Sequence, residues 1–82
     1  MTTEQFYQIK SCASIIQDLA DKGAEYSNAV RVTKENFEFE QSNGRSDNAI
    51  DFHIESEKFK ELKAKIEERI KAKNEELQKL MQ

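Results

Sequence analysis

The chain has 82 residues, one cysteine, no proline and a formal net charge of −3. This length allows a single domain, residues 1–82, with a small core, and the lone cysteine excludes an internal disulfide. The acidic balance argues against nucleic-acid binding, and no apolar run reaches the roughly 18 residues that a membrane span needs. Because the N-terminus also lacks the pattern of a secretion signal, we expect a cytoplasmic protein that does not span a membrane.

The first predicted element is a helix that begins near residue 3. Thr2 or Thr3 can cap its N-terminus, and Gln5 has the spacing of a capping box. Apolar or small side chains then recur every three or four residues, as on one face of a helix: Phe6, Ile9, Cys12, Ala13, Ile16, Leu19 and Ala20. Gly23 is a natural helix stop, which predicts an end between residues 22 and 29. Tyr26 continues the spacing, however, and leaves open a helix that passes through the glycine.

The middle of the chain, residues 30–54, changes to an alternating pattern. Apolar side chains there stand two residues apart, which is typical of half-buried strands: Val30 and Val32, Phe37 and Phe39, then Ile50, Phe52 and Ile54. Between them lies the polar segment 42–47, in which Asn43 and Gly44 favour a tight turn because they adopt positive φ at low cost. The pattern predicts a β-hairpin that turns at this segment.

The last predicted element is a long helix over residues 56–81, capped by Ser56 and built from strong helix formers without glycine or proline. Its apolar stripe consists of Phe59, Leu62, Ile66, Ile70, Leu77, Leu80 and Met81. The steps of three, four and four residues fit an eleven-residue repeat better than heptads.

The length of this helix predicts an interface. A helix of about 25 residues spans roughly 38 Å, whereas a strand of about six residues covers about 20 Å. The hairpin and the first helix would therefore leave Leu77, Leu80 and Met81 uncovered. We expect these residues, with Ile70, to form the contact surface of a homodimer or of a complex with a protein partner, while Phe59, Leu62 and Ile66 form the core.

Side chains that could carry chemistry are few and scattered. His53 lies on the polar side of the second predicted strand between Asp51 and Glu55, and no second histidine is present to complete a metal site. Cys12 lies on the apolar stripe of the first helix, where a buried cysteine usually acts as a small hydrophobic residue. Two glycines are too few for a phosphate-binding loop. We expect no enzymatic activity, no metal and no cofactor.

Alternation along the predicted strands places Glu38, Glu40 and Asp51 on one outer face of the sheet. Such a face can be an ordinary hydrated surface that keeps the strands from aggregating. It can also block the basic surface of a nucleic-acid-binding protein. This second interpretation makes the chain an acidic decoy inhibitor, which is an alternative to binding through helices.

In length, in its abundance of Lys, Glu, Ile and Asn, and in its lack of proline and tryptophan, the chain resembles small accessory proteins of bacteriophages. The helix 3–22 and the tail 56–82 make it similar to the cytoplasmic antiholins that support lysis inhibition in T-even phages. The resemblance covers the whole chain without a signature motif, so no functional residue is carried over. It implies binding to the short cytoplasmic part of a membrane holin, which would delay pore assembly and host lysis.

In chain order, these elements predict an α+β fold, helix–β-hairpin–helix (αββα), with a helix over about 3–22, a hairpin over about 30–54 and a long C-terminal helix over about 56–81. Most of the chain is helical in this prediction, and more so if the middle segment is irregular. We expect a regulatory protein that binds a helical segment of its partner and holds the partner out of its active oligomer. A dimeric structural or assembly factor is the third hypothesis.

Overall fold

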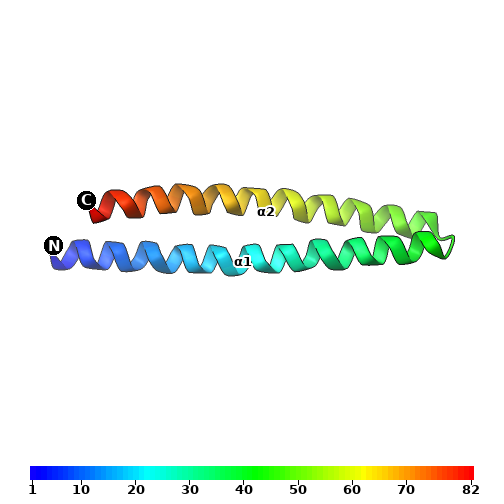
Figure 1. The fold of residues 1–82 in the computed structure, drawn as a ribbon, viewed down its shortest axis with the longest axis horizontal. Coiled ribbons are helices and arrows are strands. Elements are labelled where there is room, and N and C mark those ends of the chain that lie inside the picture. The colour runs from blue at the N-terminus through cyan, green and yellow to red at the C-terminus, as the bar shows by residue number, and fades with distance from the viewer.

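The computed structural model describes all 82 residues and shows two long helices that lie side by side in opposite directions (Figure 1). Helix α1 covers Thr3–Ser42 and helix α2 covers Ser46–Met81. A short turn joins them at one end of the molecule, and both termini lie at the other end. The result is a thin rod whose Cα atoms extend over 63 × 14 × 12 Å. Neither helix combines the length and the apolar character that crossing a membrane requires.

The predicted α+β fold is wrong, because the chain has no strands and residues 30–54 belong to the two helices and their turn. The apolar residues of this segment satisfy two periods at once. Val30 and Phe37 are seven residues apart and lie half-buried at the contact with α2, whereas Val32 and Phe39 are exposed. Packing against a second helix buries the side chains at the seven-residue spacing along the whole segment. An isolated hairpin, by contrast, is only marginally stable without an element that covers its apolar face. The segment therefore folds as helix.

The turn lies where the sequence predicts it. α1 ends at Ser42, Gly44 has a φ of 75°, and α2 begins at Ser46. Gly44 is the only residue with positive φ, a conformation that costs a residue with a Cβ atom roughly 1 kcal/mol. The Asn-Gly pair thus predicts the turn correctly, but the elements on both sides of it are helices instead of strands.

α1 continues through Gly23, so the predicted helix end is wrong. The helix begins as predicted, with the backbone N–H of Gln5 donating to the Thr2 hydroxyl oxygen over 3.1 Å. Glycine inside a helix costs about 1 kcal/mol, which the packing of residues before and after Gly23 offsets. Ser56, predicted to cap the last helix, lies buried within α2 instead, because that helix begins at Ser46.

A continuous seam of buried and half-buried residues holds the two helices together, at alternating steps of three and four residues. In α1 the seam consists of Gln5, Ile9, Cys12, Ile16, Leu19, Gly23, Tyr26, Val30, Thr33, Phe37 and Glu40. In α2 it consists of Ala49, Phe52, Ser56, Phe59, Lys63, Ile66, Ile70, Lys73, Leu77 and Leu80. Lys63 and Lys73 complete the heptads of α2 and interrupt its apolar stripe. The predicted eleven-residue repeat is therefore wrong, since it counted apolar residues only.

The C-terminal end of α2 does not project beyond the rest of the chain. With 40 residues against 36, α1 runs alongside the whole of α2 (Figure 1). Leu77 and Leu80 are half-buried at the seam, and the side-chain amide of Gln5 donates to the Leu80 carbonyl oxygen over 3.0 Å. Met81 is exposed at 62%. The predicted overhang is wrong because it depended on a first helix about half as long as α1.

Candidate helix-binding faces

The heptad pattern divides the surface outside the seam into two broad faces and two outer edges. Side chains on one flank of the seam in α1 lie beside the side chains on the same flank in α2, so each broad face belongs to both helices. We name these the Lys34 face and the Leu62 face. The outer edges are the sides of the two helices that point away from each other.

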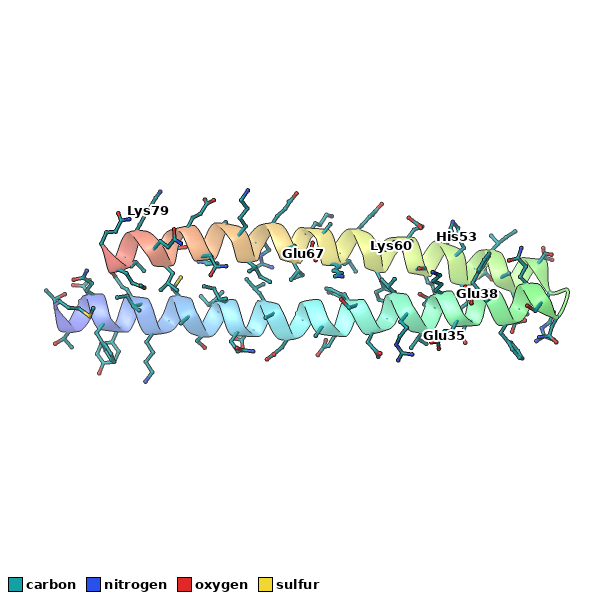
Figure 2. All side chains as sticks on the ribbon, in the orientation of Figure 1. Glu35, Glu38, His53, Lys60, Glu67 and Lys79 are labelled. Carbon is teal, nitrogen blue, oxygen red and sulfur yellow. The ribbon has the colours of Figure 1, made fainter.

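The Lys34 face is basic. Its exposed charged residues are five bases, Lys10, Arg31, Lys34, Lys60 and Lys71, and three acids, Glu38, Glu57 and Glu67. Its large exposed apolar residues are Phe6, Ile50 and Met81. Figure 2 shows Glu38 of α1 together with His53 and Lys60 of α2 in the half of the rod nearer the turn. Because bases outnumber acids, this face favours an acidic partner.

A hollow of about 340 Å³ opens over the seam on the Lys34 face. It is lined by the half-buried apolar seam residues Val30 and Phe37 and by Lys34, Glu38, His53, Ser56 and Lys60. The ring centroids of Phe37 and His53 are 5.7 Å apart. The seam is thinly filled here because Thr33 and Ser56, both small and polar, occupy buried positions. The Thr33 hydroxyl donates to the Ala29 carbonyl oxygen of its own helix over 2.8 Å, so it adds nothing across the seam.

The Leu62 face has exposed apolar side chains on both helices and a nearly balanced charge. Ile15, Val32 and Leu62 are 37%, 38% and 38% exposed, and Phe39 near the turn is 59% exposed. The small residues of this face are Ala29 and Ala72. Its charged residues are six acids, Glu4, Asp18, Glu25, Asp51, Glu55 and Glu76, and five bases, Lys22, Lys58, Lys65, Arg69 and Lys79. This face therefore offers apolar contacts along most of the rod without a strong net charge.

The outer edges carry acids and no bases. These acids are Asp21 and Glu35 of α1 and Asp47, Glu61, Glu68 and Glu75 of α2. Figure 2 shows Glu35 at the edge of α1 that is turned away from α2. Arg31, from the Lys34 face, pairs with Glu35 over 2.9 Å. The two edges are the most acidic surfaces of the molecule.

An ion pair between Glu40, the last seam residue of α1, and Arg45 pins the turn. The hydrogen bond from the Arg45 guanidinium is the main reason that the pKa of Glu40 lies below its ordinary value of 4.5, and the same bond raises the pKa of Arg45. The guanidinium also lies 5.6 Å from the centroid of the Phe39 ring. These contacts hold the two helix ends together at the turn.

At the opposite end of the rod, a second hollow of about 490 Å³ lies beside Cys12. The buried Cys12 thiol donates to the Lys73 carbonyl oxygen over 3.4 Å. It occupies a seam position, as expected for a small hydrophobic residue. No group of three or more His, Cys, Asp or Glu side chains is placed so that it could hold a metal ion.

The structure divides the predicted interface residues into two groups. Phe59, Ile66, Ile70, Leu77 and Leu80 lie in the seam against α1. Leu62 and Met81 are exposed, on different faces. The predicted acidic residues also separate, with Glu38 on the Lys34 face, Glu40 in the seam and Asp51 on the Leu62 face. These acids would share one face only in strands, where alternate side chains point the same way. In a helix, side chains two residues apart point in different directions.

The Lys34 face was not predicted from the sequence, because its hollow combines residues on both sides of the turn. One signal for it was present. Ile9, Ile16, Gly23, Val30 and Phe37 stand seven residues apart without interruption, which indicates one helix over the whole segment. Extending the first helix on this signal would have placed residue 34 beside the seam.

Comparison with protein-family models, with curated proteins and with solved structures found no match to this chain. The function is therefore inferred from the faces of the rod and their chemistry.

Proposed function

We propose that this protein is a non-enzymatic regulatory protein that acts in the cytoplasm and binds an acidic, amphipathic helix of a partner along the Lys34 face. The partner's helix would lie in the groove between α1 and α2 and would be withheld from the partner's own assembly. The observation that carries the proposal is the hollow over the seam, which combines apolar lining from Val30 and Phe37 with a rim on which two bases, Lys34 and Lys60, outnumber one acid, Glu38.

The groove between two antiparallel helices is a favourable place for a third helix. Side chains of the incoming helix can pack between the ridges of the pair, and apolar anchors three or four residues apart can enter the groove. Phe6 and Met81 supply exposed apolar surface at one end of the Lys34 face, and the hollow supplies it near the other end. The excess of bases selects a helix with an acidic flank and speeds the encounter.

A capture experiment tests this proposal. Wild-type protein and the Lys34→Glu variant are used to capture partners from the native host, and the bound proteins are identified by mass spectrometry. A partner bound by the wild type should be lost from Lys34→Glu. The control Ser14→Glu places the same acidic side chain on the outer edge of α1 and should keep the partner. If both variants capture the wild-type set, the Lys34 face is not the binding surface and the proposal fails.

The resemblance to lysis-inhibition antiholins names one specific target, the short cytoplasmic segment of a phage holin. A labelled synthetic peptide of such a segment allows a direct measurement by fluorescence anisotropy. We expect saturable binding to the wild type that weakens at least tenfold in Lys34→Glu. If no binding occurs up to about 1 mM peptide, a concentration that reveals even weak specific complexes, the holin segment is not the target.

The outer edges favour a second function, that of an acidic decoy for a basic protein surface. Glu61, Glu68 and Glu75 stand seven residues apart and form one line along α2, and no base interrupts either edge. Binding of this kind weakens steeply with added salt. Changing the three glutamates to glutamine should abolish it, whereas a complex that survives this change and is lost in Lys34→Glu indicates the Lys34 face instead.

A further inference from the structure

We propose that a second copy of the chain packs on the Leu62 face, with the two rods parallel and both turns at the same end. The product is a four-helix bundle that leaves the Lys34 face of each copy free for a partner, so the pairing goes beyond the proposed function. Three features of the rod favour it: its exposed area, the placement of its apolar side chains and the distribution of its charges.

The rod exposes more surface than a compact protein of its mass. Its accessible area is 6210 Å², whereas a compact monomer of 9.6 kDa exposes about 5,100 Å². The excess of about 1,100 Å² is comparable with the roughly 800 Å² that each partner buries in a standard stable interface. Since only six residues are buried in the single chain, covering a broad face would supply the core that the chain lacks.

The Leu62 face suits self-association better than the Lys34 face does. Ile15, Val32 and Leu62 are each more than one-third exposed and lie in the middle of this face. The small side chains of Ala29 and Ala72 allow the helices of a second copy to approach closely. In a dimer formed by two Lys34 faces, the five bases and three acids of one copy would meet the five bases and three acids of the other, with a net repulsion. In a dimer formed by two outer edges, acids would meet acids.

Contacts across the seam show which residues lie at the same height along the rod. A Cβ atom on Gly23 would lie 3.5 Å from Cγ2 of Ile66, so these two residues are level. Because the helices are antiparallel, residue numbers rise toward the turn in α1 and away from it in α2. The number of the α2 residue that is level with a given residue of α1 therefore falls by one for each residue gained along α1. Counted from this pair, Asp18 is within about 3 Å of the height of Arg69, and Glu25 is within about 3 Å of the height of Lys65.

Charge decides the direction of the second rod. On the Leu62 face, α1 carries the acids Glu4, Asp18 and Glu25 and the base Lys22, while α2 carries the bases Lys58, Lys65, Arg69 and Lys79 and the acids Asp51, Glu55 and Glu76. Parallel rods, related by a twofold axis along their length, place α1 of each copy on α2 of the other, so the acidic helix meets the basic one. Antiparallel rods would stack the acidic α1 on itself. The charges therefore favour the parallel pair.

The same arrangement pairs the apolar residues of the Leu62 face. At matching heights, Ala29 of one copy lies against Leu62 of the other, and Ile15 lies against Ala72. Each contact occurs twice, because a twofold interface is formed by the same patch on both copies. The ion pairs Asp18 with Arg69 and Glu25 with Lys65 then lie between these two apolar contacts along the rod.

Sedimentation equilibrium with matched variants tests the choice of face. The wild type should be a dimer at about 0.1 mM, and a monomer at that concentration would overturn the proposal. Leu62→Glu should raise the dimer dissociation constant at least tenfold, while the control Ile54→Glu, an equal change at an exposed apolar residue of the outer edge, should leave it unchanged. Circular dichroism checks the helicity of each variant, and Ile15→Lys replaces Leu62→Glu if the latter unfolds. An unchanged constant in a folded Leu62→Glu or Ile15→Lys would place the dimer contact on another surface.

The distance between two spin labels tests the direction of the rods. In a Cys12→Ser background, a nitroxide attached to Ser42→Cys marks the turn end of the outer edge of α1, away from the proposed contact. Parallel rods should give a distance between the two labels below about 40 Å, since neighbouring helix axes are about 10 Å apart and the two α1 helices, which lie diagonally across the bundle, are about 14 Å apart. A distance near 60 Å, close to the 63 Å length of the rod, would show antiparallel rods and overturn the proposed orientation. The Lys34→Glu variant should give the same short distance, which separates this pairing from partner binding on the Lys34 face.

Discussion

Replacing Gly23 with alanine should stabilise the protein, because α1 passes through this position as an uninterrupted helix. Gly23 has no positive φ, and an added Cβ atom would meet only the Cγ2 atom of Ile66 at 3.5 Å, an ordinary van der Waals contact. Alanine is favoured over glycine in a helix interior by about 1 kcal/mol. The new methyl group is half-buried at the seam and adds a fraction of the roughly 0.8 kcal/mol of full burial. The expected gain in the free energy of unfolding is about 1–1.5 kcal/mol.

Thermal unfolding followed by far-ultraviolet circular dichroism measures this gain. For a domain of this size, it should raise Tm by about 4–10 °C. Variants are compared at equal protein concentration, because self-association shifts the apparent stability. Gly44→Ala is the matched control. Gly44 has a φ of 75° and no neighbour within 4 Å, so the alanine should cost roughly 1 kcal/mol through the backbone alone, and the two variants should move Tm in opposite directions.

A lower Tm for Gly23→Ala would refute this reasoning. It would mean that Gly23 ends a helix in the left-handed conformation, as the sequence by itself suggests, and that α1 is not continuous. An unchanged Tm would mean that position 23 is frayed and makes no seam contact with Ile66.

Three further predictions concern the seam and the turn. Ile66→Ala should lower the free energy of unfolding by about 2–3 kcal/mol, the low end of the range for core residues because the rod is only two helices thick; unchanged urea denaturation would show that the seam is not the core. Lys63→Leu should raise Tm, since an apolar side chain at a seam position adds about 1 kcal/mol, and a lower Tm would contradict the assigned heptad. The pKa of Glu40 is lowered in the folded chain by Arg45, so this contact adds stability above pH 4.5 that is lost as the pH falls through the lowered pKa. Glu40→Gln should remove that part of the acid dependence of Tm, and identical profiles would contradict the role of the ion pair.

Local features of the fold were predictable from the sequence. Thr2 and Gln5 mark the start of α1 because a capping hydrogen bond joins residues three apart. Asn43 and Gly44 mark the turn because glycine reaches positive φ without a steric cost. The helix over residues 56–81 follows from an unbroken run of good helix formers.

The segment 30–54 was not predictable by the same means. Its apolar residues fit a period of two, which indicated strands, and also fit the seven-residue spacing that continues through Val30 and Phe37. Local propensity did not separate these patterns, because aromatic and β-branched residues favour strands. The candidate faces depended on this segment, so Lys34 was placed on no surface and Glu38 was grouped with Glu40 and Asp51.

The sequence by itself determined where the chain turns and how its first helix begins, since both depend on the backbone conformation of a few neighbouring residues. Only the tertiary structure decided that residues 30–54 are helical and that lysines complete the seam of α2. The physical reason is that burial along the seam is gained only when residues far apart in the chain pack against each other. The two broad faces, and with them the candidate binding surfaces, exist only because the second helix lies beside the first.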